Sequence, residues 1–496
     1  MPAVSESKGR TRVGRRSRPV KTESGEVRTD FVEPRAKAWW WVVTAVSLVV
    51  ALVIAGGLQW HFGWVEALPH QSTANSTDIT IAAQPSAAEI AATAPMRAVD
   101  ASAVAEALEP YLGGTAAGAL GPHVDLIVTG LTGNAAFTQG SDPITPASTL
   151  KLLTAAAALD VLGPQARFST SVRQTGPHAL ALVGGGDPYL VSRVSKGAYP
   201  RTSSLAALAR QTAKYLKEHG VKRIKLTYDD SLFVGPSFDP SWEPGYRLSV
   251  VPPIGALSVD EAVLPSGAVS ATPAQSARDA FALLLKQRGI TVTGQGKNTV
   301  TSASDSTIAT VASSPLVDIL AELLARSDNF AAEVVARHVA IAEGEPASFD
   351  GAVDAIEQVL RDMKIPLKGL SMHDGSGLSR HNRLTPKTLV SILRLGVSSP
   401  RFAGLLTGLP VAGFDGTLSY RFARSEKSAL GNVRAKTGTL TGVHSMAGIA
   451  VDSTGVPLIF VAIADQVPVA RTLEARGVLD DIGAALSGCA CSVPAP

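Results

Sequence analysis

The stretch that decides the fold reads Pro146-Ala-Ser-Thr-Leu-Lys-Leu-Leu-Thr-Ala155, and the Ala- and Leu-rich sequence after it predicts a helix over Ser148–Leu162. Residues three apart share one face of a helix, so Lys151 is expected beside Ser148, one turn along. A serine hydroxyl becomes a good nucleophile when a neighbouring base takes its proton. The free N–H groups at the start of a helix also favour a developing oxyanion. Ser148 is therefore the candidate nucleophile and Lys151 the candidate base.

Taken alone, a serine followed three residues later by a lysine is weak evidence for a catalytic pair. A helix-capping serine followed by a surface lysine has the same spacing, and Ser5-Glu-Ser-Lys8 near the N-terminus matches it as well. For Lys151 to act as a base, burial and a nearby positive charge must lower its pKa. Lys436 is the candidate for that second charge.

A second motif, Ser327-Asp328-Asn329, lies between an amphipathic helix predicted at Leu316–Arg326 and another helix beginning at Phe330. A helix–loop–helix corner of this kind can direct Ser327 and Asn329 into a cleft, while Asp328 points away or stabilises the turn. Ser327 could then relay a proton and Asn329 could donate to an amide. The alternative is that Ser, Asp and Asn are ordinary turn-forming residues.

The third motif, Lys436-Thr437-Gly438-Thr439, follows the strand-like residues from Asn432. A lysine beside two threonine hydroxyls can bind a carboxylate. Gly438 removes a side chain where a substrate backbone could lie against the strand edge. The alternative is a β-hairpin with an incidental lysine. Three adjacent antiparallel strands are predicted here, at Asn432–Thr437, Val443–Val451 and Pro457–Ala464.

Strand-like and helix-like segments alternate from residue 98 onward, which predicts a mixed α/β body. Val124–Thr129 and Ala179–Val183 are predicted strands. The chain between the first two motifs is far longer than a connection between two helices needs, so it can hold an inserted domain. We place the catalytic domain at 98–170 and 301–496 and the insert at 171–300.

The N-terminal 97 residues have a different composition. Residues 1–37 contain the excess positive charge of a chain with net charge +3, so the body is not expected to bind nucleic acid. Residues 38–58 are uncharged and long enough to cross a membrane as a helix. The basic side predicts a single-pass anchor in the cell membrane, with the N-terminus cytoplasmic and the body outside. The alternatives are a buried core helix and a cleaved signal peptide, and the bulky residues that follow disfavour cleavage. Residues 59–97 are expected to be a flexible spacer.

Metal and cofactor signals are absent from the sequence. The two cysteines, Cys489 and Cys491, are too close in sequence for an unstrained disulfide and too few for a zinc site. We assign them to a disordered tail with no role. No cluster of His, Cys and Asp has metal-ligand spacing, and no phosphate-binding Gly-x-x-x-x-Gly-Lys occurs.

The three motifs in this order resemble the active-site serine penicillin-binding proteins. The flanking sequence is similar to one group of them, the class C low-molecular-mass D-alanyl-D-alanine carboxypeptidases/endopeptidases, from about Ala98 to Ala485. The segments that carry this narrower resemblance are Pro146–Ala155, Gly184–Tyr189, Asp229–Phe233, Leu257–Glu261, Asp374–Pro386, Phe414–Leu418 and Arg434–Leu440.

The resemblance implies a penicillin-binding transpeptidase/β-lactamase-like domain carrying an inserted domain. It also implies a serine acyl-enzyme formed at Ser148 on peptidoglycan stem peptides ending in D-Ala-D-Ala, with β-lactams as covalent inhibitors and no cofactor. The roles it implies are these: Lys151 as base, Ser327 as proton relay, the Ser148 and Thr439 N–H groups as oxyanion site, Asn329 and Thr439 as peptide holders, and Lys436 and Thr437 facing the terminal carboxylate.

Two alternative functions are a β-lactamase, which uses the same acyl-enzyme chemistry, and a non-catalytic wall-binding protein. A β-lactamase needs fast deacylation, often by a glutamate, and no class A Glu-x-x-x-Asn pattern follows Asn329. A non-catalytic wall-binding protein is disfavoured because every motif residue is intact. Carboxypeptidase action is expected, with endopeptidase action on cross-links as the alternative; the oligomeric state stays open. The Gly375-Ser376-Gly377 stretch after Asp374 is expected to be chiefly a turn.

Overall fold

A computed structural model describes residues 97–195, 202–294 and 296–493. The predicted basic tail, the predicted anchor and almost all of the predicted spacer lie outside these residues.

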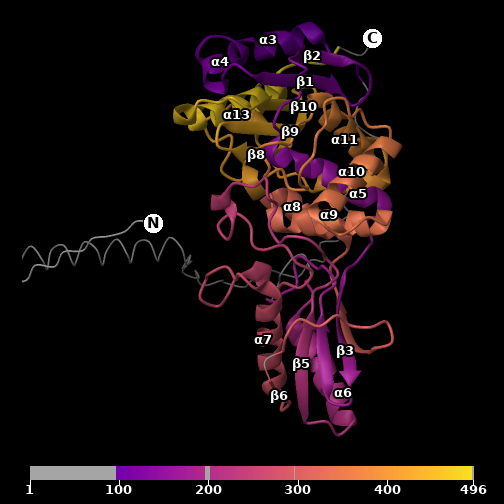
Figure 1. Ribbon diagram of the computed structural model, residues 1–496. Coiled ribbons are helices and arrows are strands. Elements are labelled where there is room, and N and C mark those ends of the chain that lie inside the picture. Colours follow the sequence, from indigo (N-terminus) through magenta and orange to yellow (C-terminus); the bar gives the residue numbers. More distant parts are fainter. Residues whose placement is uncertain (1–96, 196–201, 295, 494–496) are drawn as a thin grey trace, which may run out of the picture. The chain divides into compact units, whose positions relative to one another are not determined.

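Five antiparallel strands form the first sheet, in the order β2-β1-β10-β9-β8 (Figure 1). The strands are β1 Val124–Gly130, β2 Ala135–Gln139, β8 Val433–Leu440, β9 Val443–Val451 and β10 Pro457–Ala464. The hairpin β1–β2 pairs with the far C-terminal strand β10, so both ends of the described chain build one sheet. The three adjacent strands predicted near the C-terminus are confirmed, with the first displaced to Val433–Leu440.

Helices cover both faces of this sheet. Alternate side chains of a strand point to opposite faces, and β1 follows this rule. Leu126 and Val128 join the core under α3, α4 and α13, whereas Ile127 joins the core under α5 and α11. The helices are α3 Ala101–Leu112, α4 Gly114–Leu120, α13 Thr472–Gly488, α5 Lys151–Val161, α8 Leu316–Arg326, α9 Asn329–Glu343, α10 Phe349–Asp362, α11 Pro386–Ser398 and α12 Gly404–Thr407. The fold is therefore mixed α/β with an antiparallel sheet, as predicted.

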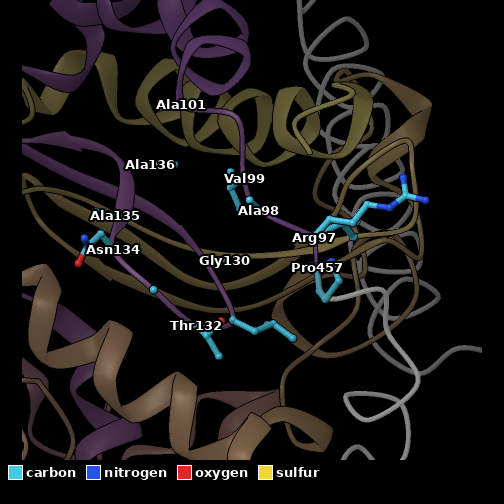
Figure 2. A pocket seen from close by; sticks show the side chains of 13 residues that line it. Arg97, Ala98, Val99, Ala101, Gly130, Thr132, Asn134, Ala135, Ala136 and Pro457 are labelled. Carbon is cyan, nitrogen blue, oxygen red and sulfur yellow. The ribbon is translucent and has the colours of Figure 1, made fainter. Parts of the chain in front are cut away.

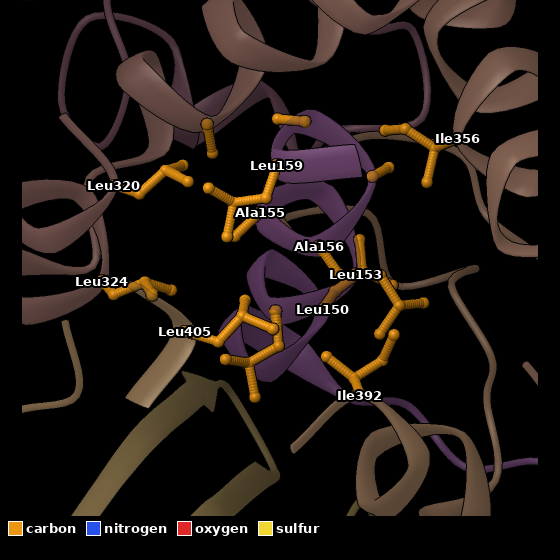
Figure 3. Packing of buried hydrophobic residues seen from close by; sticks show 14 of the residues in the cluster. Leu150, Leu153, Ala155, Ala156, Leu159, Leu320, Leu324, Ile356, Ile392 and Leu405 are labelled. Atoms are coloured by element: carbon orange, nitrogen blue, oxygen red, sulfur yellow. The ribbon is translucent and has the colours of Figure 1, made fainter. Parts of the chain in front are cut away.

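Helix α5 passes through the middle of the larger core (Figure 3). Every side chain from Lys151 to Leu159 is buried, as expected for a helix that is apolar on all sides. Its alanines let α8, α9, α10 and α11 pack closely around it. The predicted helix Ser148–Leu162 is confirmed, with a 3-10 turn, η1 (Ala147–Leu150), at its start.

A second sheet, in the order β6-β5-β4-β3-β7, is formed by the chain between α5 and α8. Its strands are β3 Ser169–Gly176, β4 Ala179–Val183, β5 Arg223–Asp229, β6 Thr291–Thr293 and β7 Ser306–Ala312, and helices α6 Leu205–Glu218 and α7 Pro273–Lys286 pack on it. This part has a hydrophobic core of its own. We call it the insert. Its predicted limits, 171 and 300, stay a prediction, although β3 begins before the first limit and β7 follows the second.

The Gly184-Gly-Gly-Asp-Pro-Tyr189 segment joins the insert to α9. A Cβ at Gly185 would collide with the Ser169 carbonyl, and Gly186 has φ +68° with His338 of α9 against it. His338 lies 2.9 Å from the Gly186 carbonyl through its Nε2. The glycines of this segment are therefore needed for close packing of backbone.

The expectation of a disordered, functionless cysteine tail is wrong. Cys489 and Cys491 form a disulfide, and Cys491 is fully buried. Backbone hydrogen bonds from Asp100 N to the Cys491 carbonyl, 2.9 Å, and from Val493 N to the Ala98 carbonyl, 2.8 Å, hold the segment in place. Its order comes from pairing with residues at the other end of the described chain, which local sequence does not reveal.

Within the described ranges, no single helix is long and apolar enough to cross a membrane. One bent pair, Pro386–Ser398 with Pro400–Thr407, meets that test by length and composition only.

Candidate active site

Ser148 lies in the 3-10 turn η1, half-buried and close to β8 and β9. Ala147 before it has φ +48°, in the left-handed region that non-glycine residues rarely adopt. Two hydroxyls hold this turn through the Pro146 carbonyl: Thr149 Oγ1 and Ser445 Oγ each donate to it at 2.7 Å. The position of the serine is thus set by contacts with strand β9 as well as by its own helix.

Lys151 is fully buried, and its amine contacts three oxygen atoms. Nζ lies 3.0 Å from Ser148 Oγ, 2.7 Å from Asn329 Oδ1 and 2.6 Å from the Ser376 carbonyl. Burial lowers the pKa of Lys151 to about 8, against the opposing influence of Asp374, Glu333 and Asp328. An amine with this pKa is neutral in roughly one molecule in ten at neutral pH, far more often than an exposed lysine. The alternative of an ordinary surface lysine is excluded.

Ser327 ends α8 in the left-handed conformation, φ +59°. Its Oγ accepts a hydrogen bond from Lys436 Nζ at 2.9 Å. Asp328 caps α9, because its carboxylate accepts from Ala331 N at 3.0 Å. The corner therefore presents Ser327 and Asn329 to the two lysines while Asp328 stabilises the turn, as expected from the sequence.

Lys436, on β8, is fully buried like Lys151. Burial and the nearby Lys151 lower the pKa of Lys436 well below its usual value. Next to it, Thr437 Oγ1 donates to Thr417 Oγ1 at 3.0 Å, a neighbour not anticipated from the sequence. Thr439, two residues further along β8, is exposed.

The structure explains the glycine at position 438 differently from the sequence. A Cβ at this position would lie 2.8 Å from the Pro146 carbonyl and 2.9 Å from Ser148 N, and closer still to Ser445 Oγ. The glycine thus lets β8 approach the turn that carries the nucleophile. Space for a substrate backbone at this Cβ position is not what it provides.

The structure thus brings together five motif residues from η1, α5, the α8–α9 corner and β8: Ser148, Lys151, Ser327, Asn329 and Lys436. The family model described as "D-Ala-D-Ala carboxypeptidase 3 (S13) family" matches residues 116–267 and 253–486.

The chain belongs to this S13 family. The prediction of a serine-type D-Ala-D-Ala carboxypeptidase is confirmed at the level of the family, as is the resemblance to low-molecular-mass penicillin-binding proteins.

Relatives and a solved structure agree with this assignment. Carboxypeptidase DacB of Mycolicibacterium smegmatis is 34% identical over 90% of this chain and 96% of its own length. A carboxypeptidase of Mycobacterium tuberculosis is 34% identical over 82% of this chain and 87% of its own. The crystal structure of penicillin binding protein 4 from Haemophilus influenzae shares the fold, with a TM-score of 0.62 and 23% identity over 76% of this chain and 98% of that one.

In this S13 peptidase, the Asp374–Asn382 loop contacts the catalytic lysine, a role that the sequence does not predict. The Ser376 carbonyl is one of the three Lys151 acceptors, and Gly377, with φ +84°, leaves room for the Ala147 carbonyl and for Ser148 N, which a Cβ would approach to 3.1 Å. The signal that could have identified it is a glycine on each side of Ser376. The loop is a turn, as expected, and it also packs directly on the nucleophile turn.

A buried ion pair lies beneath this loop. Glu333 of α9 is fully buried and accepts from Gly375 N at 3.1 Å, and Arg337, one turn later, lies 3.6 Å from its carboxylate. Burial and Asp374 raise the pKa of Glu333 to about 7, against the opposing influence of Arg337. Neither residue stands out in the sequence, because a glutamate and an arginine four residues apart are typical of an exposed helix surface. The structure buries every side chain of α9 from Phe330 to Ala340.

The hollow shown in Figure 2 is not this site. Its lining, which includes Arg97, Val99, Gly130, Thr132 and Asn134, comes from the start of the described chain and the β1–β2 hairpin. It contains none of the motif residues. Among the residues that the structure describes, no group of three or more His, Cys, Asp or Glu side chains could hold a metal ion.

Gly438→Ala is predicted to reduce acylation by penicillin at least about 10-fold, because the new methyl group would push β8 away from the Ser148 turn. The measurement is the rate of labelling by a fluorescent penicillin. Gly477→Ala on α13, where a Cβ meets nothing within 4 Å, is the matched control and should label at the normal rate. Normal labelling of Gly438→Ala would contradict the packing argument.

Proposed function

We propose that Ser148 is acylated by the penultimate D-Ala of peptidoglycan stem peptides, with Lys151 as its base, and that water then releases the shortened peptide. The observation that carries this proposal is the contact set of the Lys151 amine. A neutral amine has two N–H groups and one lone pair. If the N–H groups donate to Asn329 Oδ1 and the Ser376 carbonyl, the lone pair faces Ser148 Oγ at 3.0 Å.

In the acylation step, the Ser148 proton moves to Lys151 Nζ while Oγ bonds to the carbonyl carbon of the penultimate D-Ala. The backbone N–H groups of Ser148 and Thr439 are the proposed donors to the oxyanion. Collapse of the tetrahedral intermediate breaks the peptide bond. The departing amine of the terminal D-Ala needs a proton, which Ser327 would supply from its hydroxyl. Ser327 would take a proton in return from Lys436 Nζ, 2.9 Å from its Oγ, while Lys151 holds the proton taken from Ser148.

Substrate orientation is assigned to the third motif and to Asn329. The terminal carboxylate would face the N–H and O–H donors of Lys436, Thr437 and Thr439. A bound carboxylate also favours the protonated form of Lys436, against the effect of burial. Asn329 would hold the peptide amide. Gly438 contributes by close packing, and its part in binding substrate is limited to its backbone.

A β-lactam would acylate the same serine, because its strained amide presents a carbonyl and a carboxylate in a similar arrangement. Ser148 Oγ would bond to the lactam carbonyl carbon, and the lactam C–N bond would break. The related Haemophilus influenzae penicillin binding protein 4 has been crystallised with a β-lactam. Endopeptidase action on cross-links remains the second candidate, since it uses the same bond chemistry on a bulkier leaving group.

We further propose that residues 38–58 anchor the enzyme in the cell membrane with the catalytic domain outside, where peptidoglycan lies. The support is the uncharged composition of that segment and the basic residues before it.

Ser148→Ala is predicted to abolish both covalent penicillin labelling and release of D-Ala, because the Ser148 hydroxyl is the only hydroxyl hydrogen-bonded to the Lys151 amine among the described residues. Mass spectrometry of defined muropeptides measures the product: loss of one D-Ala indicates carboxypeptidase action, and separation of a cross-linked dimer indicates endopeptidase action. The label on the unchanged enzyme should persist for minutes or longer. Rapid release of hydrolysed drug would instead indicate a β-lactamase.

The acylation rate is predicted to rise with pH, with a midpoint near the Lys151 pKa of about 8. Raising the pH removes the proton from Lys151, and only the neutral amine can accept the Ser148 proton. The measurement is the second-order rate constant of penicillin labelling from about pH 6 to about pH 9.5. Lys151→Arg, whose guanidinium stays protonated, should remain unlabelled throughout. A flat profile would refute the role of Lys151 as base.

Deletion of residues 1–58 is predicted to move the enzyme from the membrane fraction to the soluble fraction of the cells, since it removes the only apolar stretch proposed as an anchor. Immunoblotting of the two fractions checks this. A deletion of residues 1–30, which leaves the apolar stretch intact, is the control and should stay in the membrane fraction. An equal distribution of both proteins would exclude the anchor.

A further inference from the structure

A long loop of the insert, between β5 and α7, reaches the active site and makes three polar contacts there. Trp242 Nε1 donates to Asp374 Oδ2 at 2.7 Å, and Ser241 Oγ lies 2.8 Å from Ser379 Oγ while its own hydrogen goes to the Asp239 carboxylate. Asn329 Nδ2 donates to the Val250 carbonyl at 3.3 Å. All three partners belong to the catalytic domain. The loop therefore touches the catalytic machinery at two separate places.

The first place is Asp374, a fully buried carboxylate. Besides the Trp242 indole, it accepts from Gly377 N at 2.8 Å, Ser379 N at 2.7 Å and Asn382 Nδ2 at 2.9 Å. Those three donors belong to the same loop as Asp374, and Trp242 supplies the fourth from the insert. A carboxylate surrounded in this way fixes the path of its loop, because leaving any buried donor or acceptor unpaired is costly.

The path of this loop determines where the Ser376 carbonyl points. Ser376 lies between Asp374 and Gly377, and its carbonyl accepts from Lys151 Nζ at 2.6 Å. A displacement of Asp374 would move this carbonyl. The indole of Trp242 is therefore connected to the Lys151 amine through one carboxylate and one short stretch of backbone.

The second place is Asn329, whose side-chain amide is bonded at both ends. Its Nδ2 donates to the Val250 carbonyl, and its Oδ1 accepts from Lys151 at 2.7 Å. The Val250 carbonyl thus fixes which end of the amide faces the lysine. Together, the two contacts control both acceptors that share the Lys151 amine with Ser148.

We propose that the insert completes the active site by orienting the two acceptors of Lys151, with Trp242 and the Val250 carbonyl as positioning groups. This inference rests on the proposed role of Lys151 as base. It assigns the insert a part in the chemical step, which its separate core alone does not suggest.

The alternative is that Trp242 only fills space. It is buried and makes an edge-to-face contact with Phe349, with ring centroids 5.2 Å apart. A phenylalanine would keep most of that packing and lose only the N–H donor. Trp242→Phe therefore separates the two roles.

The charges around Lys151 determine which pH effect is expected. Asp374 on the loop, Glu333 on α9 and Asp328 at the N-cap of α9 favour the protonated amine of Lys151. Lys436 on β8 is also near this amine, and its own pKa is lowered by burial and by Lys151. The Ser376 carbonyl and Asn329 Oδ1 also favour the ammonium, since they accept its N–H groups. Misplacing these acceptors lowers the pKa of Lys151 and at the same time leaves its lone pair badly aimed.

The test is the pH profile of penicillin labelling of the full chain, with rates expressed per labelled Ser148. Trp242→Phe should lower the plateau rate about 10-fold, the size of effect expected for one hydrogen bond to a buried charge. Its midpoint should move to lower pH. A role in packing alone would reduce the number of labelled sites and leave both the rate per site and the midpoint unchanged, which would overturn the proposal.

Tyr246→Phe is the matched control, because Tyr246 lies in the same loop and its hydroxyl has no hydrogen-bond partner among the described residues. It should label like the unchanged enzyme. Ser241→Ala is a second, milder variant that removes the contact with Ser379 and the hydrogen bond to Asp239 in the same loop. We expect a fall in the same direction of about 2- to 5-fold. It keeps the proposal testable if Trp242→Phe does not fold, and an unchanged rate and midpoint would then refute it.

Asp374→Asn, alone and combined with Trp242→Phe, tests the route. If Trp242 acts through Asp374, the double variant should be no slower than Asp374→Asn alone. Additive losses would place the action of Trp242 elsewhere and contradict the proposed route. If the unchanged enzyme takes no label at Ser148, the proposed function itself fails, which is a distinct outcome.

Discussion

The amine of Lys151 has no exposed surface, and a lysine in such a position is tolerated because three oxygen atoms surround its Nζ. These oxygens come from three places in the chain: the turn before α5, the start of α9, and the loop that carries Ser376. The hydrogen-bond set forms only when all three converge. Much of the catalytic domain can be understood as the frame that makes them converge and excludes water from the amine.

The frame works by close approach of backbones. Gly438 brings β8 against the Ser148 turn, and Gly377 brings the Ser376 loop against the same turn. The alanines of α5 allow the surrounding helices to pack without gaps around the helix that carries the lysine. Protein interiors are packed as densely as organic crystals, so a methyl group added at either glycine must displace one of these segments.

Opposing influences on the buried lysines set the pKa of Lys151. Burial lowers the proton affinity of both Lys151 and Lys436, and the nearby Lys151 lowers that of Lys436 further. Asp374 and Glu333, themselves buried, act in the opposite direction on Lys151. The pKa of about 8 is the result of this opposition. It leaves the lysine able to exchange a proton with Ser148 near neutral pH, and one of the acids responsible is held in place by the insert through Trp242.

The sequence alone determined the features that depend on residues close together in the chain. The three-residue interval between Ser148 and Lys151, the helices on both sides of Ser327 and the alternating strands near the C-terminus are all short-range patterns, and the structure contains each of them. Family membership likewise followed from motifs in order. The tertiary structure alone decided why Gly438 is a glycine, that Ser376 faces Lys151, that Cys491 is buried, and that Trp242 reaches Asp374. Each of these is a contact between segments distant in the chain, and helical or strand periodicity reports which side of an element is buried without reporting what lies against it.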